Sequence, residues 1–92
     1  MKINYYYLEG CNRKAIVFVE GNKKYLFSYT TLVADVEEKE NLKILRIFDY
    51  YSTTTSKHIN KFCLQHNFTI PSKKQIEAEV EKVGHYEQII KL

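Results

Sequence analysis

The spacing of apolar residues changes once along this chain, near Tyr51, and that change constrains the fold more than any other feature. Before it, apolar residues alternate with polar ones or form short runs, which is typical of β-strands. After it, apolar residues recur at intervals of three and four, which is typical of amphipathic helices. Strands and helices segregated in this order indicate an α+β fold with the helices on one face of a sheet.

Four stretches fit strands: 2–8, 14–20, 25–37 and 42–48. Their short connections predict an antiparallel meander. The alternation shifts phase near Thr31, which predicts a bend or bulge that splits the third strand. The tyrosine-rich strands could stack on nucleic-acid bases, but a chain of 92 residues needs its rings for a core, and we expect them there.

Two helices are expected after Tyr51. One face of the first is apolar and carries Thr55, Ile59, Phe62, Cys63 and His66, and the opposite face carries Lys57, Asn60, Lys61 and Leu64. Ser72 is the expected N-cap of the second helix, and Gly84 sits where a helix often stops. The tail, 85–92, fits either an extension of that helix or an edge strand. We therefore predict a single α+β domain over 1–92: a four-stranded antiparallel meander followed by two helices packed on one face.

Five consecutive hydroxyl residues lie where the last strand gives way to the first helix: Ser52, Thr53, Thr54, Thr55 and Ser56. Ser and Thr favour the N-cap because their oxygens accept hydrogen bonds from unpaired backbone N–H groups. A helix N-terminus with hydroxyls and Lys57 nearby could also bind an anion, although the chain has no Gly-rich phosphate loop. We expect the run mainly to cap the helix and shape the junction.

The sequence carries no catalytic or metal-binding signature. Ser56, Lys57 and His58 are neighbours on a helix, so their side chains diverge, and there is no Gly-x-Ser-x-Gly motif. Cys63 and His66 could share a ligand face, but His58 points away from Cys63 and a closed zinc site needs four ligands. We expect no enzyme activity, no metal and no cofactor.

The two cysteines, Cys11 and Cys63, are expected to be free thiols in a reducing cytosol. The beginning of the chain shows no apolar stretch like that of a signal peptide. No run approaches the roughly 20 apolar residues that span a bilayer. We therefore expect no membrane association.

The charge is mildly positive, +3 from 14 basic and 11 acidic residues, which excludes an acidic DNA mimic and lacks the density of a dedicated nucleic-acid binder. Its distribution is uneven. Residues 50–76 contain no acid and four lysines, Lys57, Lys61, Lys73 and Lys74. This region supports an alternative function, a nucleic-acid-binding accessory protein, although binding to generic duplex DNA is expected to be weak.

Two stretches together resemble a known family. The first is "LFSYTTLVA" (26–34), in which Ser28, Tyr29, Thr31, Val33 and Ala34 fit a Ser-Tyr-x-Thr-x-Val-Ala pattern. The second is "YYSTTTSKHINKF" (50–62), in which residues 51–58 fit Tyr-Ser-x-Thr-Thr-Ser-Lys-His without a gap. The pair resembles a family of small, mostly phage- and prophage-encoded proteins of unassigned function.

This resemblance implies a viral protein that acts in the cytoplasm of a bacterial host. It supplies no catalytic residues. Small phage proteins often bind and inhibit host defence complexes, so we expect a non-enzymatic inhibitor of anti-CRISPR type that acts by protein–protein contact. The expected partner is a host protein or ribonucleoprotein such as a CRISPR–Cas complex, with nucleic acid contacted weakly or indirectly and a homodimer left open. The outer helix face then predicts the contact residues Lys57, His58, Lys61 and Leu64.

Overall fold

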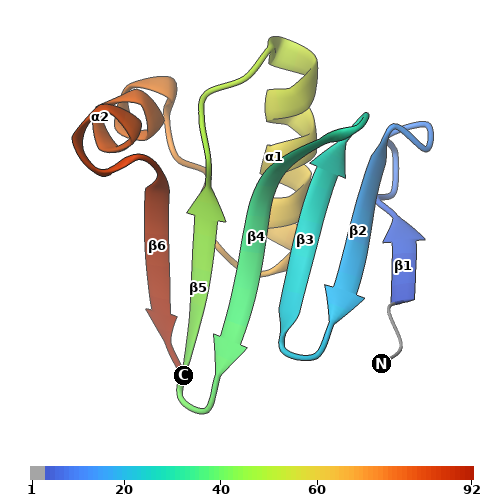
Figure 1. Ribbon diagram of the computed structural model, residues 1–92, viewed down its shortest axis with the longest axis horizontal. Helices are drawn as coiled ribbons and strands as arrows, with labels where there is room; N and C mark the ends of the chain where they lie inside the picture. The colour runs from blue at the N-terminus through green and yellow to red at the C-terminus, as the bar shows by residue number, and fades with distance from the viewer. Residues whose placement is uncertain (1–3) are drawn as a thin grey trace.

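The computed structural model describes residues 4–92 and shows one six-stranded antiparallel sheet with two helices (Figure 1). The elements are β1 (Asn4–Tyr7), β2 (Ala15–Glu20), β3 (Lys23–Ser28), β4 (Thr31–Lys39), β5 (Leu42–Ile47), α1 (Thr53–Gln65), α2 (Lys73–Val83) and β6 (Tyr86–Lys91). The strands lie in the sheet in sequence order, β1 to β6. The predicted α+β class and antiparallel meander are confirmed, but the count of four strands is wrong. Lys2 and Ile3 of the first predicted strand lie outside the described residues.

The stretch 25–37 forms two strands because the chain reverses completely at Tyr29 and Thr30. Tyr29 adopts the left-handed conformation, with φ +58°, and Ser28 pairs directly with Thr31 across the turn. The pairing register also shifts between Leu26 and Phe27. The predicted irregularity is therefore present, but it accompanies a hairpin and not a bend within one strand.

The tail supplies the sixth strand. β6 pairs antiparallel with β5, with Ile47 opposite Tyr86 and Leu42 opposite Lys91. Its side chains alternate between half-buried and exposed, as expected for an edge strand with one face on a core. Of the two structures that the sequence left open for 85–92, the edge strand is the one observed.

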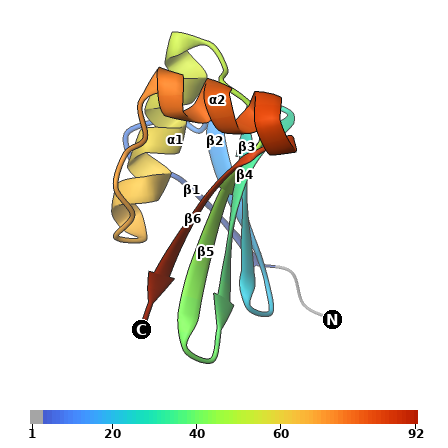
Figure 2. The same cartoon turned by 90° about the vertical axis from the view of Figure 1, so that its left-hand side faces the viewer.

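The hydrophobic core fills the space between the sheet and α1. Its largest completely buried side chains include Phe62 from α1, Leu26 and Val17 from the sheet, and Leu45 and Ile47 from β5. Figure 1 shows α1 behind the sheet, and Figure 2 shows α2 lying crosswise where β6 begins. The prediction that both helices pack alike on one face is therefore too simple.

The two helices are capped as their sequences predict. In α2, the Ser72 side chain accepts a hydrogen bond from Gln75 N, and Gln75 Oε1 accepts one from Ser72 N, which forms a capping box. Gly84 ends α2 in the left-handed conformation, with φ +92°. In α1, the side chain of Ser52 is the N-cap.

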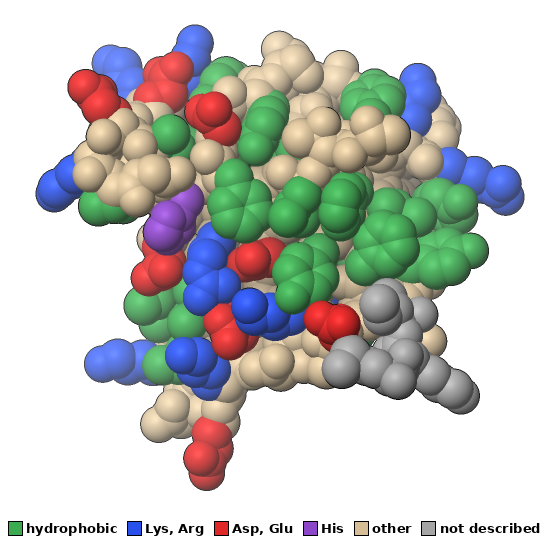
Figure 3. Space-filling model, in the orientation of Figure 1, with side chains coloured by type: hydrophobic (Ala, Val, Ile, Leu, Met, Phe, Trp, Pro, Cys, Tyr) green, Lys and Arg blue, Asp and Glu red, His purple; other side chains and the backbone are tan. Residues whose placement is uncertain are grey.

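The face of the sheet opposite α1 is open and has two unlike halves (Figure 3). On β1, β2 and β3 it carries a cluster of rings, here called the aromatic half: Tyr5, Tyr7, Phe18, Tyr25 and Phe27. None of these side chains belongs to the hydrophobic core. The expectation that the rings of these strands build the core is wrong for this set, because strand alternation places Tyr6 toward the core and Tyr5 and Tyr7 away from it.

The other half of the open face, on β4, β5 and β6, is held by ion pairs around Arg46. Its guanidinium lies 3.1 Å from Asp35, 2.9 Å from Glu37 and 3.7 Å from Glu87. The hydrogen bond from Arg46 lowers the pKa of Glu37. Burial raises the pKa of Asp35 in spite of the same arginine. These three acids are therefore already engaged within the molecule.

Candidate functional site

The two stretches of the resemblance meet at one place in the structure. Ser28 Oγ at the end of β3 lies 2.9 Å from Thr55 Oγ1 and 2.8 Å from His58 Nδ1, both on α1. All three side chains are buried. This Ser28 network ties the β3–β4 turn to the first half of α1, although its members are 27 and 30 residues apart in sequence.

The Ser28 network is satisfied by a neutral histidine. Burial lowers the pKa of His58, and the positive charge of Lys14 lowers it further. The Nδ1 atom of a neutral imidazole can accept a hydrogen bond from the Ser28 hydroxyl, while Ser28 Oγ accepts one from the Thr55 hydroxyl. Each buried hydroxyl therefore has a partner. The arrangement lets a polar cluster lie next to the core without a buried charge.

Tyr29 stands at the surface directly beyond the network. Its left-handed backbone is unusual for an aromatic residue and carries a cost of about 1–2 kcal/mol. Its N–H donates to Lys14 O at 2.7 Å, and its ring centroid lies 5.9 Å from that of His58. Strained non-glycine residues concentrate at functional sites, so the surface around Tyr29 is a candidate functional site.

That surface is a basic groove of about 300 Å³ between α1 and the β1–β2 loop. Its lining includes Gly10, Cys11, Asn12, Lys14, Tyr29, Thr54, Lys57, His58 and Lys61. Within the part of the chain that the structure describes, none of the lining residues is acidic, and no ion pair involves its three lysines. The groove therefore presents to solvent three lysines that form no ion pair among the described residues.

Gly10 permits the close approach of Lys61 to the loop. Its backbone has φ +78°, and a Cβ at this position would lie 2.6 Å from Lys61 Nζ. A side chain here would be strained by the backbone and would displace the lysine. The shape of the groove thus depends on glycine at this position.

The predicted contact residues divide between the surface and the interior. Lys57, Lys61 and Leu64 are exposed along one strip of α1, and Leu64 keeps 61% of its surface accessible. His58, predicted as a contact residue, is only 4% exposed because it turns inward to Ser28. Its position in the Ser28 network was missed by the sequence argument, as were Lys14, Ser28 and Tyr29 as parts of the site.

The hydroxyl run has separate roles along its length. Ser52 Oγ accepts a hydrogen bond from Thr55 N at 3.3 Å, which makes it the N-cap of α1. Thr53 and Thr54 are exposed, Thr55 joins the Ser28 network, and Ser56 is half-buried. The expectation of a cap is confirmed for Ser52, and Thr55 adds a tertiary contact that a cap alone does not require.

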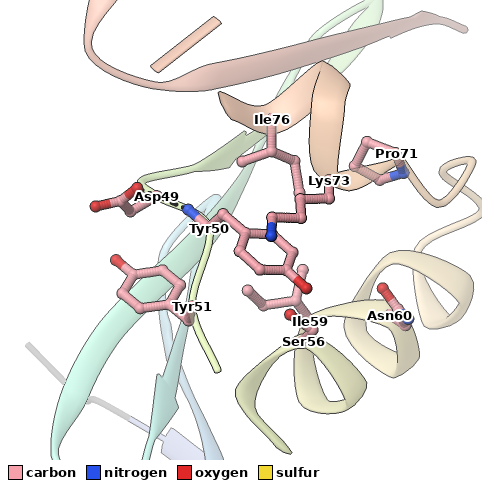
Figure 4. A pocket seen from close by; sticks show the side chains of 9 residues that line it. All are labelled: Asp49, Tyr50, Tyr51, Ser56, Ile59, Asn60, Pro71, Lys73 and Ile76. Carbon is pink, nitrogen blue, oxygen red and sulfur yellow. Dashed lines mark hydrogen bonds between the residues drawn. The ribbon is translucent and has the colours of Figure 1, made fainter. Parts of the chain in front are cut away.

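A second hollow lies on the other flank of α1, toward α2 (Figure 4). It measures about 170 Å³, and its lining includes Tyr50, Tyr51, Ile59, Lys73 and Ile76. The Lys73 ammonium lies 5.1 Å from the centroid of the Tyr50 ring. Burial and the charge of Asp49 raise the pKa of Tyr51. Its lining combines aromatic, apolar and charged side chains.

The two cysteines, Cys11 in the β1–β2 loop and Cys63 on α1, are buried. Both are free, and burial raises the pKa of the Cys63 thiol to about 12. Among residues 4–92, no cluster of three His, Cys, Asp or Glu side chains is arranged to hold a metal ion. Over the same residues, no helix has the length and hydropathy needed to cross a membrane.

Comparison with known proteins gives one result. No curated protein and no solved structure matches the chain. A family model described as a family of unknown function (DUF8033) matches residues 6–78, which include the whole Ser28 network and the basic groove. The match agrees with the expectation of a family without an assigned role, and the chain belongs to this family of unknown function.

Proposed function

We propose that this protein is a binding module that acts by contact and not by catalysis, with its partner docked on the outer strip of α1 and the basic groove beside it. One observation carries the proposal: Lys57, Lys61 and Leu64 share an exposed strip of a helix that is anchored to the sheet, next to a groove that Lys14 also faces. A helix that displays two cations followed by an apolar residue on one strip is suited to an acidic protein surface.

The Ser28–His58 pair supports contact more than chemistry. A serine nucleophile must be reachable by substrate, and Ser28 is only 2% exposed. Its hydroxyl is also shared with Thr55, and no buried carboxylate orients His58 among the hydrogen bonds of the described residues. The hydrogen bond between the two residues fixes α1 against the sheet, and a helix that binds a partner needs a fixed position.

The biological role that fits this module best is the one that the sequence resemblance suggests. We place the protein as a phage-encoded inhibitor of a bacterial defence complex, of anti-CRISPR type, working in the host cytoplasm. Three lysines around a groove suit contact with carboxylates of a protein or with the phosphates of a nucleic acid that such a complex holds.

The test compares partner capture by the wild-type protein and by charge-reversed variants. Each tagged protein is used to capture partners from lysate of the bacterial host, and inhibition of the defence activity is measured in parallel. Lys57→Glu/Lys61→Glu is expected to abolish both capture and inhibition while folding normally, because both side chains are exposed. Lys74→Glu/Lys82→Glu, with the same change in net charge on α2, is the matched control and should retain both. Full capture by the α1 variant refutes this docking site.

Nucleic-acid binding through the basic region 50–76 is the second candidate function. The positions of its lysines in the structure support this function less than they support protein contact. Lys57 and Lys61 face the groove, whereas Lys73 lies on the opposite flank of α1 over Tyr50. A duplex would have to contact both flanks. Affinity for duplex DNA that falls steeply with salt, at sub-micromolar strength near physiological salt, would favour this candidate over protein contact.

A further inference from the structure

The aromatic half of the open face is a second surface that the α1 site does not explain. Two of its rings, Tyr5 and Tyr7, remain 59% and 45% exposed although they sit in a strand. The rings form a contiguous set: the Tyr5 and Phe18 centroids lie 5.9 Å apart, and those of Phe18 and Phe27 5.4 Å. Contiguous exposed rings on a small protein usually mark a binding surface.

Strand register arranges the rings in rows across the sheet. Tyr5, Phe18 and Tyr25 are directly paired across β1, β2 and β3, and Tyr7, Ile16 and Phe27 form the next row. Figure 3, in the orientation of Figure 1, shows a band of hydrophobic side chains over this part of the sheet. A row of rings on an open antiparallel sheet offers successive platforms on which the bases of a single strand can stack.

Positive charge lies along the rim of these rows. The Arg13 guanidinium lies 5.6 Å from the centroid of the Tyr7 ring. Lys14, the next residue, lies 6.0 Å from the ring centroid of Tyr29, which lines the basic groove and is not part of the aromatic half. Both residues are in the β1–β2 loop, at the end of the strands that carry the rings. Phosphates of a strand stacked on the rings would meet cations at this rim.

The nearby acidic side chains do not lie among the rows of rings, and within the described residues none forms an ion pair with Arg13. Asp35, Glu37 and Glu87 are paired with Arg46 on the other half of the face. Glu9 lines a hollow on the α1 side with Lys61, and Glu20 lies at the far end of β2, opposite Lys23. A second copy of the chain is a poorer match for this surface than a polyanion. It would place the same cations against those at the rim, and its Asp35, Glu37 and Glu87 are already paired.

We propose that the aromatic half binds single-stranded nucleic acid, with bases stacked on Tyr5, Tyr7 and their neighbours and phosphates at Arg13 and Lys14. The rings of this surface are separate from the α1 strip, and Lys14 is the one residue that it shares with the basic groove. The proposal does not depend on the partner of that strip. Its ligand is defined by unpaired bases, which are unavailable in a duplex. Weak binding to duplex DNA is therefore compatible with it.

The test measures fluorescence anisotropy of labelled 12-nucleotide single-stranded DNA and RNA of mixed sequence, with a duplex of the same sequence as comparison. Single strands should bind at least about tenfold more tightly than the duplex. Tyr5→Ala/Tyr7→Ala should weaken binding by at least about fivefold, the lower limit for loss of one stacked base. Tyr5→Phe/Tyr7→Phe should retain affinity, because the ring faces remain. Arg13→Ala/Lys14→Ala should reduce the salt dependence.

The matched control is Ile70→Ala/Ile89→Ala, which removes two exposed apolar side chains away from both the aromatic half and the α1 strip and should leave binding unchanged. Equal affinity for single strands and duplex, or unchanged affinity after loss of both tyrosines, overturns the proposal. Sedimentation is measured in parallel. A dimer that Tyr5→Ala/Tyr7→Ala dissociates, with no single-strand affinity, would assign the face to a second copy instead.

Discussion

The inner and outer faces of α1 show how one motif divides between holding the fold and presenting a surface. Inward, Thr55, His58 and Phe62 are buried against the sheet. Outward, Lys57 and Leu64 are exposed. Neighbours in the sequence Ser-Lys-His thus point in opposite directions. A run of motif residues on a helix therefore combines two kinds of constraint, and only its outward members are candidates for direct contact with a large partner.

The largest expected contrast between the two faces is in stability. Phe62→Ala removes a completely buried ring and should lower the free energy of unfolding by about 3–5 kcal/mol. Leu64→Ala, two residues along the same helix, should change it by less than about 0.5 kcal/mol. Urea denaturation monitored by circular dichroism measures both. Similar losses for the two variants would mean that α1 is packed differently.

The inner face should also make stability depend on pH. His66 is buried with Nε2 unpaired within the described structure, and burial, helped by Lys24 and Lys43, lowers its pKa to about 4. The unfolded chain, with a histidine pKa near 6.5, binds the proton first. Stability from this residue is therefore complete above pH 6.5 and is lost as pH falls toward 4.

That loss should be about 3 kcal/mol over the interval, from the difference between the two pKa values. The measurement is urea denaturation at several pH values for wild type and His66→Phe, which keeps a ring against Phe62 but cannot be protonated. Wild type should lose more stability than the variant between pH 6.5 and 4. Parallel curves for the two proteins would contradict a buried neutral His66.

Local patterns in the sequence predict much of this fold. The buried stripe of α1, the cap at Ser72 and the stop at Gly84 all follow from spacing or from capping chemistry. The chain reversal at Tyr29 does not, because the turn contains neither Gly nor Asn and its left-handed tyrosine is held by contacts with Lys14 and the Ser28 network. Alternation in β1 separates two faces but does not indicate which face a helix covers.

The candidate site was only half predictable for a similar reason. Exposed Lys57 and Lys61 follow from the helical period. The Ser28 network depends on a contact between distant residues, which periodicity does not report. Two signals were present: Ser28 falls in phase with buried Leu26, and His58 lies three residues after Thr55 and four before Phe62. Polar residues in phase with a core stripe indicate a buried hydrogen-bond network.

The Ser28 network gives the next effect in size. Ser28→Ala leaves Thr55 and His58 buried without their shared partner, so we expect a loss of about 1–3 kcal/mol in the free energy of unfolding. Thr54→Ala removes an exposed hydroxyl from the same turn of α1 and should cost less than about 0.5 kcal/mol. Equal stability of Ser28→Ala and wild type would show that the network does not anchor α1.

The smallest effect separates two adjacent hydroxyls at the start of α1. Ser52 is the N-cap and Thr53 is the first helical residue, so only Ser52 Oγ accepts a bond from the helix backbone, at Thr55 N. Ser52→Ala should therefore cost about 0.5–2 kcal/mol, and Thr53→Ala should be nearly neutral. Ser52→Asp should retain the cap and add a favourable charge at the positive end of the helix dipole. Thermal unfolding of the three variants measures the order, and a greater loss for Thr53→Ala than for Ser52→Ala would shift the cap by one residue.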